Sequence, residues 1–157
     1  MRIKLQRSLD VGYFSRMVNH PDISPFVRDD SMTGDIDLSP IDSADNYLLK
    51  ALVDDQEAGF AILLVKGNDL ELHSGLLKPY RGRIAIELGR LLVEWAALHT
   101  AAMRLLTWAW DSARNVILVT KAIGFREDNR ELWPFSVAGV RVNRVNFSID
   151  LNNLRTV

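Results

Sequence analysis

The stretch from Asp69 to Phe125 constrains the fold more than any other part of the chain. Alternating apolar residues over Leu70–Leu77 predict a strand, an apolar stripe with helical spacing over Ile84–His99 predicts a helix, and Arg104–Trp110 predicts a second strand. A strand, a helix and a strand in this order form a right-handed crossover with the two strands parallel. The stretch therefore predicts one parallel strand pair at the centre of a sheet.

A short basic loop, KPYRGR, joins the first of these strands to the helix. The N–H groups at the start of a helix, together with the positive end of its dipole, attract anions. Lys78, Arg81 and Arg83 add cationic side chains at the same place. The pattern predicts a phosphate site, with a solvated basic turn as the alternative.

The periodicity of the remaining segments predicts an α+β fold, with a mixed, mostly antiparallel sheet and helices on both faces. We expect a single domain over residues 1–157. The further strands are expected at Arg2–Leu9, Tyr47–Val53, Ala58–Lys66 and Val140–Leu151, the last of which closes the sheet. Helices are expected at Val11–Asn19 and Ser112–Ala122, a helical turn at Ile23–Val27, and a polar loop at Asp29–Asp45.

Residues at the ends of the predicted helices support these assignments. Asp10 and Ser112 are side chains of the type that caps helix N-termini. Gly124 follows the last helix at the position where glycine commonly ends one.

The composition excludes several classes of function. The chain has no cysteine, which excludes disulfides and thiolate catalysis, and its three histidines lack metal-ligand spacing, so we expect no metal. A net charge of −1 gives no signal for nucleic acid or a membrane surface. The N-terminus lacks the apolar run of a signal peptide, and no stretch is apolar enough to span a bilayer. We expect a cytoplasmic protein, or a virion component if the chain is phage-encoded.

Two short motifs in the central stretch carry a family resemblance. Tyr80-Arg81-Gly82-Arg83 stands between the first strand and the long helix, and Ile123-Gly124-Phe125-Arg126 ends the second helix. In their order and separation, they resemble the acetyl-CoA loop and the closing Gly-Phe segment of the GNAT superfamily of N-acetyltransferases. The resemblance covers nearly the whole chain.

This resemblance implies a GNAT-like fold and an acetyl-CoA-dependent N-acetyltransferase that transfers the acetyl group directly to a small-molecule or peptide amine. The two parallel strands would splay apart and hold the pantetheine arm between them, while loop amides hold the pyrophosphate. A homodimer or a larger assembly is compatible with such a fold. The residues implied at the acetyl-CoA site are Leu76, Leu77, Arg81, Gly82, Arg83, Ile84 and Ala85.

The sequence departs from the family pattern at four positions. Ile84 and Ile86 occupy the glycine positions of the loop, where their side chains are expected to crowd a phosphate. Ala113 and Thr120 stand where the family has an asparagine and a tyrosine that protonates the thiolate. Asn115 is two helical positions from Ala113, about 200° around the axis, and is not expected to replace the asparagine. These departures favour an alternative, a catalytically degenerate protein that acts as a binding or assembly module.

Glu71 and His73 are the candidate catalytic residues. They alternate on one face of the strand together with Gly75. A histidine there is suited to accept a proton from an ammonium near neutral pH. A hydrogen-bonded core histidine on a half-exposed strand face is the competing interpretation.

Three further features have a functional and a structural interpretation. Trp108 and Trp110 share a strand face and would either wall a pocket or pack in the core. The acidic loop Asp29–Asp45 would either recognise an amine or lie solvated at the surface. Ser112 and Thr120 are minor candidates for protonating a thiolate.

Overall fold

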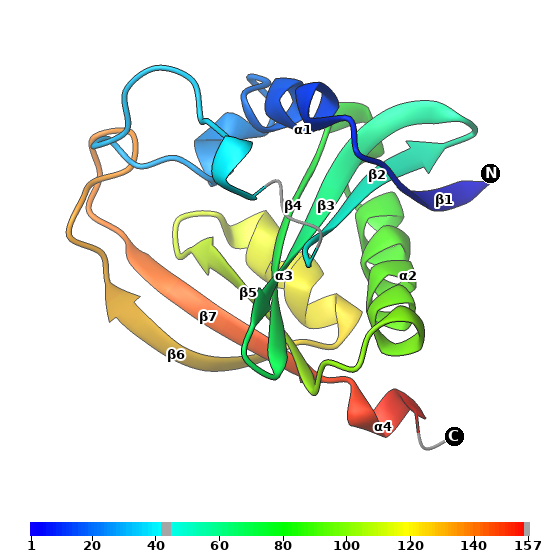
Figure 1. Ribbon diagram of the computed structural model, residues 1–157. Helices are drawn as coiled ribbons and strands as arrows, with labels where there is room; N and C mark the ends of the chain where they lie inside the picture. Colours follow the sequence, from blue (N-terminus) through cyan, green and yellow to red (C-terminus); the bar gives the residue numbers. More distant parts are fainter. Residues whose placement is uncertain (42–44, 156–157) are drawn as a thin grey trace.

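The computed structural model describes residues 1–41 and 45–155, which form one seven-stranded sheet with helices on both faces (Figure 1). The strands are β1 (Ile3–Arg7), β2 (Tyr47–Val53), β3 (Gln56–Lys66), β4 (Asp69–Leu76), β5 (Arg104–Trp110), β6 (Arg126–Leu132) and β7 (Asn143–Asp150). The α-helices are α1 (Val11–Val18), α2 (Arg83–His99), α3 (Arg114–Ile123) and α4 (Asn152–Arg155). Three short 3-10 helices are η1 (Ser24–Phe26), η2 (Ser39–Ile41) and η3 (Lys78–Tyr80).

The strands lie in the order β1-β2-β3-β4-β5-β7-β6. Every neighbouring pair is antiparallel except β4 and β5, which are parallel and joined through α2. This arrangement confirms the predicted α+β class and the predicted strand–helix–strand unit at its centre.

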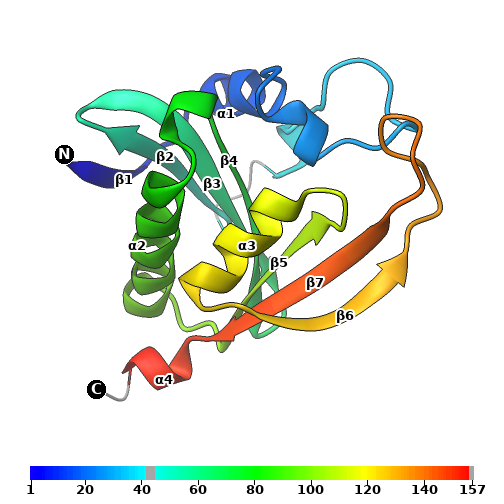
Figure 2. The same cartoon turned by 180° about the vertical axis from the view of Figure 1, so that it is seen from behind.

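Separate apolar clusters cover the two faces of the sheet. On one face α2 and α3 pack over the central strands, with Leu92 and Ala96 meeting Leu63 and Leu105 (Figure 2). On the other face α1 and η1 pack over β2 and β3. Asp10 caps α1, because its carboxylate accepts from the amide of Tyr13 at 3.2 Å, as predicted. The site described below lies where these layers meet the central strands.

The two parallel strands stay together for only two residue pairs. Leu70 lies opposite Leu105 and Glu71 opposite Leu106. The hydroxyl of Thr107 then donates to the carbonyl of Leu72 at 3.2 Å, which is the last bond between them. Beyond this point the strands separate toward their carboxyl ends, as the family resemblance implied.

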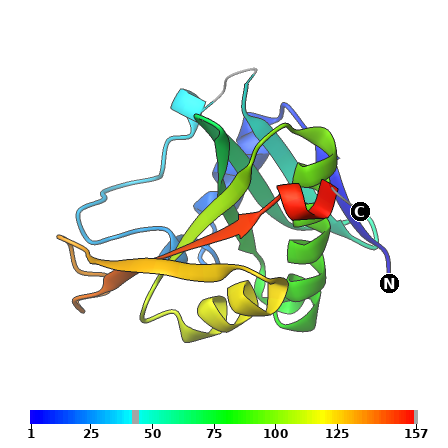
Figure 3. The ribbon, with the colours of Figure 1, turned by 90° about the horizontal axis from the view of Figure 1, so that it is seen from below.

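The last part of the sheet differs from the prediction. Strand β6 was not predicted, because five of the seven residues in its sequence REDNREL are charged and six are exposed, which leaves no apolar alternation to detect. β7 lies between β5 and β6, so the predicted strand Val140–Leu151 is interior and does not close the sheet. After β7, α4 lies against the end of α2, where Arg155 donates to the carbonyls of Ala97 and Thr100 (Figure 3).

The predicted start of α3 is also wrong. The helix begins at Arg114, with Ala113 as its N-cap and no side-chain cap. The amide of Ala113 bonds the carbonyl of Trp110 at 2.9 Å, which closes a turn that contains Ser112 and delays the helix. At the other end Gly124 has φ 124°, a backbone conformation that favours glycine and confirms the predicted helix end.

Most described residues of the predicted loop Asp29–Asp45 are exposed, but its first two residues bond the β6–β7 connection. Asp29 is 5% exposed and accepts from the indole N–H of Trp133 at 2.9 Å. Asp30 accepts from the hydroxyl of Ser136 and from the amides of Ala138 and Gly139. Residues 42–44 of this predicted loop lie outside the described residues.

We expect the hydrogen bonds of Asp30 to make the stability of the folded protein depend on pH. The Ser136 and Gly139 bonds lower the pKa of Asp30 below its ordinary value of 3.8. A carboxyl whose pKa is lower in the folded than in the unfolded protein stabilises the fold at pH values above the unfolded-state pKa. This stabilisation is lost as the pH falls through the folded-state pKa. Denaturant midpoints measured from about pH 6 to about pH 2 should therefore show Asp30→Asn less stable than the wild type, with the gap narrowing in acid. Asp35→Asn, on the exposed part of the loop, is the control; an equal gap at every pH would contradict the expectation.

Candidate functional site

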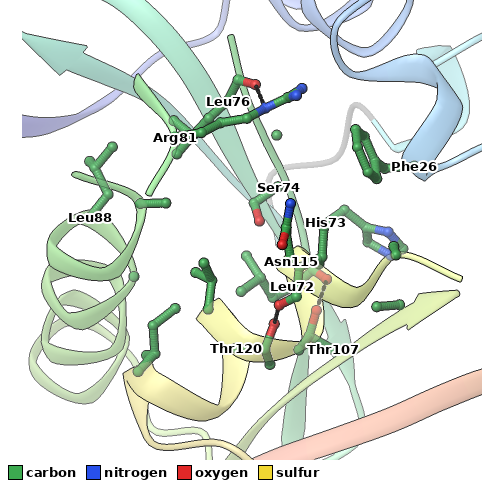
Figure 4. Close-up of a pocket in the computed structure, with 18 of the residues that line it drawn as sticks. Phe26, Leu72, His73, Ser74, Leu76, Arg81, Leu88, Thr107, Asn115 and Thr120 are labelled. Carbon is green, nitrogen blue, oxygen red and sulfur yellow. Dashed lines mark hydrogen bonds between the residues drawn. The ribbon is translucent and has the colours of Figure 1, made fainter. Parts of the chain in front are cut away.

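A cavity of about 880 Å³ occupies the gap between the separated ends of β4 and β5 (Figure 4). Helices α2 and α3 supply one side of it, and η1 with the residue after it supplies another. Most of the lining is apolar, which suits a ligand with a long, weakly polar body.

The face of α2 toward the cavity carries small residues beside Leu88 and Leu92. Gly82, Ala85 and Gly89 line the cavity, and their spacing of three and four positions places them on one face of the helix. Ile84 instead packs into the apolar cluster around Ala51 and Leu88, and Ile86 does not line the cavity. The expectation that these isoleucines crowd the site is therefore wrong, because α2 presents a different face.

The amides at the start of α2 are available to a ligand. Gly82, the N-cap, has φ 84° and ψ −126°, which only glycine adopts without strain, and it offers no side chain to cap the helix. The first amide bonded within the helix is that of Ile86, to the carbonyl of Gly82 at 3.3 Å. Among the described residues, the amides of Arg83, Ile84 and Ala85 have no protein acceptor. Such a helix start binds anions.

The backbone of β4 faces the gap at alternate residues. The amide of Leu77 bonds Ala58 in β3 at 2.9 Å, so the groups of Ser74 and Leu76 point the other way, toward β5. Because β5 has separated there, the amides of Ser74 and Leu76 have no partner in the described strands. Of the two leucines expected to hold a ligand, the structure turns Leu76 toward the gap and Leu77 toward β3.

Arg81 lines the cavity but is held by the protein itself. Its Nε donates to the carbonyl of Leu76 at 3.3 Å, and its Nη2 donates to the carbonyl of Asp22 (Figure 4). Its guanidinium also lies 5.1 Å from the ring centre of Phe26. A second cation at the cavity, Arg114 in the first turn of α3, was missed by the sequence analysis because the helix start was misplaced.

Glu71 and His73 form a hydrogen-bonded pair on β4. His73 Nε2 lies 2.6 Å from Glu71 Oε1, and both side chains are about a quarter exposed. The hydrogen bond from His73 lowers the pKa of Glu71, which favours a carboxylate that accepts from Nε2–H. In the tautomer with Nε2 as donor, the lone pair of the ring is on Nδ1. His73 lines the cavity, and the arrangement suits a proton acceptor held by a carboxylate.

The two tryptophans of β5 combine both predicted roles. Trp108 is half-buried and lines the cavity. Its ring lies edge-on to the ring of His73, with 6.4 Å between the two ring centres. Trp110 lines the cavity too but is only 2% exposed, and its indole N–H has no partner among the described residues. The guanidinium carbon of Arg144 lies 4.8 Å from the ring centre of Trp108, and Arg144 itself does not line the cavity.

Two polar side chains of α3, Asn115 and Thr120, were considered in the sequence analysis, and the structure places Asn115 differently from the expectation. Asn115 lines the cavity (Figure 4). The 200° argument fails because Ala113 has φ −89° and ψ 66° and lies outside the regular helix. Thr120, at the tyrosine position, donates its hydroxyl to the carbonyl of Val116 at 2.7 Å, so that proton is engaged within the helix.

Comparisons with known proteins identify the fold. The sequence matches no protein-family model and no curated protein. Solved structures match with high similarity in shape: a spermidine N-acetyltransferase from Vibrio cholerae, in complex with CoA and spermine, has a TM-score of 0.79 at 11% identity over 96% of each chain. A GNAT-family acetyltransferase from Streptococcus pneumoniae has a TM-score of 0.71 at 13% identity, over 95% of this chain and 99% of its own. The fold is that of the GNAT acetyltransferases, as the sequence motifs predicted.

The described residues carry neither a metal-binding cluster nor a helix that could span a membrane. No cluster of metal-ligating side chains is present among the described residues. Within the same part of the chain, no helix has the length and apolar character needed to cross a membrane.

Proposed function

We propose that this GNAT-fold chain is an N-acetyltransferase that uses acetyl-CoA and transfers its acetyl group directly to an amine. The observation that carries the proposal is the parting of β4 from β5 after two residue pairs, beside the uncapped start of α2. The structural neighbours are acetyltransferases, and one was solved with CoA bound.

The residues of the cavity fit acetyl-CoA. The amides of Arg83, Ile84 and Ala85 would hold the pyrophosphate, because they lack protein acceptors at the positive end of a helix. Gly82 and Ala85 leave room for the close approach that this requires. The amides of Ser74 and Leu76 would bond the pantetheine arm along the open edge of β4.

His73 is the candidate base. Acetyl-CoA would supply the acetyl group as a thioester, and side chains of this chain would accept the first proton. His73 Nδ1 would take one proton from the acceptor ammonium, while Glu71 holds the ring and stabilises the resulting charge. One N–C bond forms and one C–S bond breaks, and the second amine proton goes to the departing sulfur. Asn115, on α3, is a further side chain of the lining that could donate a hydrogen bond in the cavity.

The alternative of a degenerate binding or assembly module has less support. Two of the four departures behind it, Ile84 and Ile86, do not line the cavity. The other two, Ala113 and Thr120, remove side-chain contacts on α3 without closing the gap between β4 and β5. No feature of the structural neighbours favours an assembly role.

Calorimetric titration with acetyl-CoA tests the proposal. We expect the wild type to bind, and Ala85→Glu to weaken binding about tenfold or more, which corresponds to about 1.4 kcal/mol. The new carboxylate would repel the phosphates and fill the space beside the helix start.

Leu98→Glu is the matched control, since it adds the same charge to α2 at an 80% exposed position near the opposite end. It should bind acetyl-CoA like the wild type. Absence of binding by the wild type at millimolar acetyl-CoA would overturn the proposed function, and equal binding by both glutamate variants would refute the pyrophosphate assignment.

A further inference from the structure

We infer that the acceptor is a primary monoamine with an apolar body of aromatic size, and not a polyamine. The inference rests on the proposed function, since it names the acceptor of that same site. It comes from one juxtaposition: a proton acceptor, His73, lies among aromatic and aliphatic side chains in a cavity that no carboxylate of the described residues lines.

The charged side chains that line the cavity have one sign. Among the described residues these are Arg81 and Arg114, together with the titratable His73. Cations suit the phosphates of CoA, but they oppose a substrate that carries several ammonium groups. An ammonium that stays charged in an apolar cavity needs a carboxylate partner, because burial of an unpaired charge is strongly unfavourable.

Three carboxylates that are close to lining residues in the sequence are hydrogen-bonded within the protein. Glu71 is bonded to His73 at 2.6 Å. Asp22 accepts from the amide of Lys78 at 3.0 Å, which holds η1 beside the end of β4. Asp29 accepts from Trp133 and Ser31; burial raises the pKa of Asp29, but these hydrogen bonds outweigh burial and leave it below its ordinary value. Each of these carboxylates already has a donor in the protein, and none of them lines the cavity.

An apolar surface lies on the side of the sheet that His73 faces. A side chain at Gly75, two residues along the same strand face, would meet Ile23 at 2.6 Å, so this face looks toward η1. Ile23, Phe26, Val27 and Trp108 all line the cavity there. Aliphatic and aromatic walls of this kind stabilise an apolar substrate body by burial and ring contacts.

The likeness to a spermidine N-acetyltransferase does not oppose this inference. At 11% identity it shows the fold, and the acceptor depends on side chains that the two proteins need not share. With one amine, the acceptor loses its charge when His73 takes the proton, and the charge gained by His73 is paired with Glu71.

The test measures CoA release with a thiol reagent, at saturating acetyl-CoA, for phenethylamine and for spermidine. We expect kcat/KM to be at least about tenfold higher for phenethylamine. Trp108→Ala should lower kcat/KM for phenethylamine about tenfold, while the Kd of acetyl-CoA measured by calorimetry stays unchanged.

A second test asks whether an added carboxylate increases activity toward a polyamine. Val27→Asp adds a carboxylate to the cavity wall and should raise kcat/KM for spermidine relative to phenethylamine about tenfold. Val11→Asp makes the same change in the same apolar cluster, outside the cavity, and should leave the ratio unaltered. Acetyl-CoA binding with spermidine as the better substrate, or with no turnover of either amine, would overturn this inference alone. Failure to bind acetyl-CoA would overturn the proposed function, and the inference with it.

Discussion

Replacing His73 with alanine is expected to lower kcat/KM for acetyl transfer by about 10²- to 10⁴-fold, the usual effect of losing a general base. The variant should bind acetyl-CoA as the wild type does, because the amides proposed to hold acetyl-CoA lie on α2 and on the open edge of β4. The increase of rate with pH that reflects loss of the base's proton should also disappear. Steady-state kinetics from about pH 6 to about pH 9 would measure both effects.

Glu71→Gln separates the role of the base from the role of its partner. A glutamine keeps the shape but not the charge that stabilises a protonated His73, so we expect a smaller loss, about tenfold to 100-fold in kcat. A pH profile for His73→Ala that matches the wild type would dismiss His73 as the base. Equal losses in both variants would indicate that the pair acts only as a unit.

The second large effect is expected on stability, from Gly59→Ala. A Cβ at Gly59 would lie 2.0 Å from the carbonyl oxygen of Gly75, a backbone atom that moves only if β3 and β4 part. Overpacking of this kind costs about 3 kcal/mol, or about 6–12 °C in Tm for a chain of this size. The carbonyl of Gly59 also accepts from the hydroxyl of Tyr13 at 2.5 Å, so the shift would strain a buried bond between α1 and the sheet.

Gly12→Ala is the control for this prediction. Gly12 is exposed in α1, and the nearest atom to a new Cβ is the capping carboxylate oxygen of Asp10 at 3.3 Å, which need shift only slightly. Alanine favours a helix over glycine by about 0.5–1 kcal/mol, which offsets this shift, so the melting temperature should stay close to that of the wild type. A melting temperature of Gly59→Ala within error of the wild type would contradict the predicted clash.

The sequence predicted the fold where periodicity and end signals agree. Tyr47–Val53 and Arg104–Trp110 match their strands residue for residue, because each is partly or fully buried and bounded by polar turns. β6 was not predicted because both of its faces are exposed to solvent. Its pairing with β7 therefore requires no alternation of apolar residues in the sequence. The late start of α3 depends on a backbone turn between Trp110 and Ala113, which side-chain type does not specify.

The candidate site was predicted in place but not in detail. His73, Glu71 and the basic loop were found because strand alternation and helix starts are local properties. The face that α2 turns to the cavity depends on packing against β2 and β3, and this decides that Ala85 lines the cavity while Ile84 does not. Asn115 was set aside by assuming helical geometry at a residue that lies outside the helix.

The charged side chains of β6, which kept this strand from being predicted, also have a consequence for solubility. β6 is the last strand of the sheet, so one side of its backbone has no partner among the described strands. An open strand edge is a template on which another chain adds a strand, and this is a common route to aggregation. Residues Arg126–Leu132 place charged or amide side chains at six of seven positions along this edge. A second chain that paired there would have to bring its own strand against this row of charges, and the sequence REDNREL thus protects the protein against edge-to-edge aggregation.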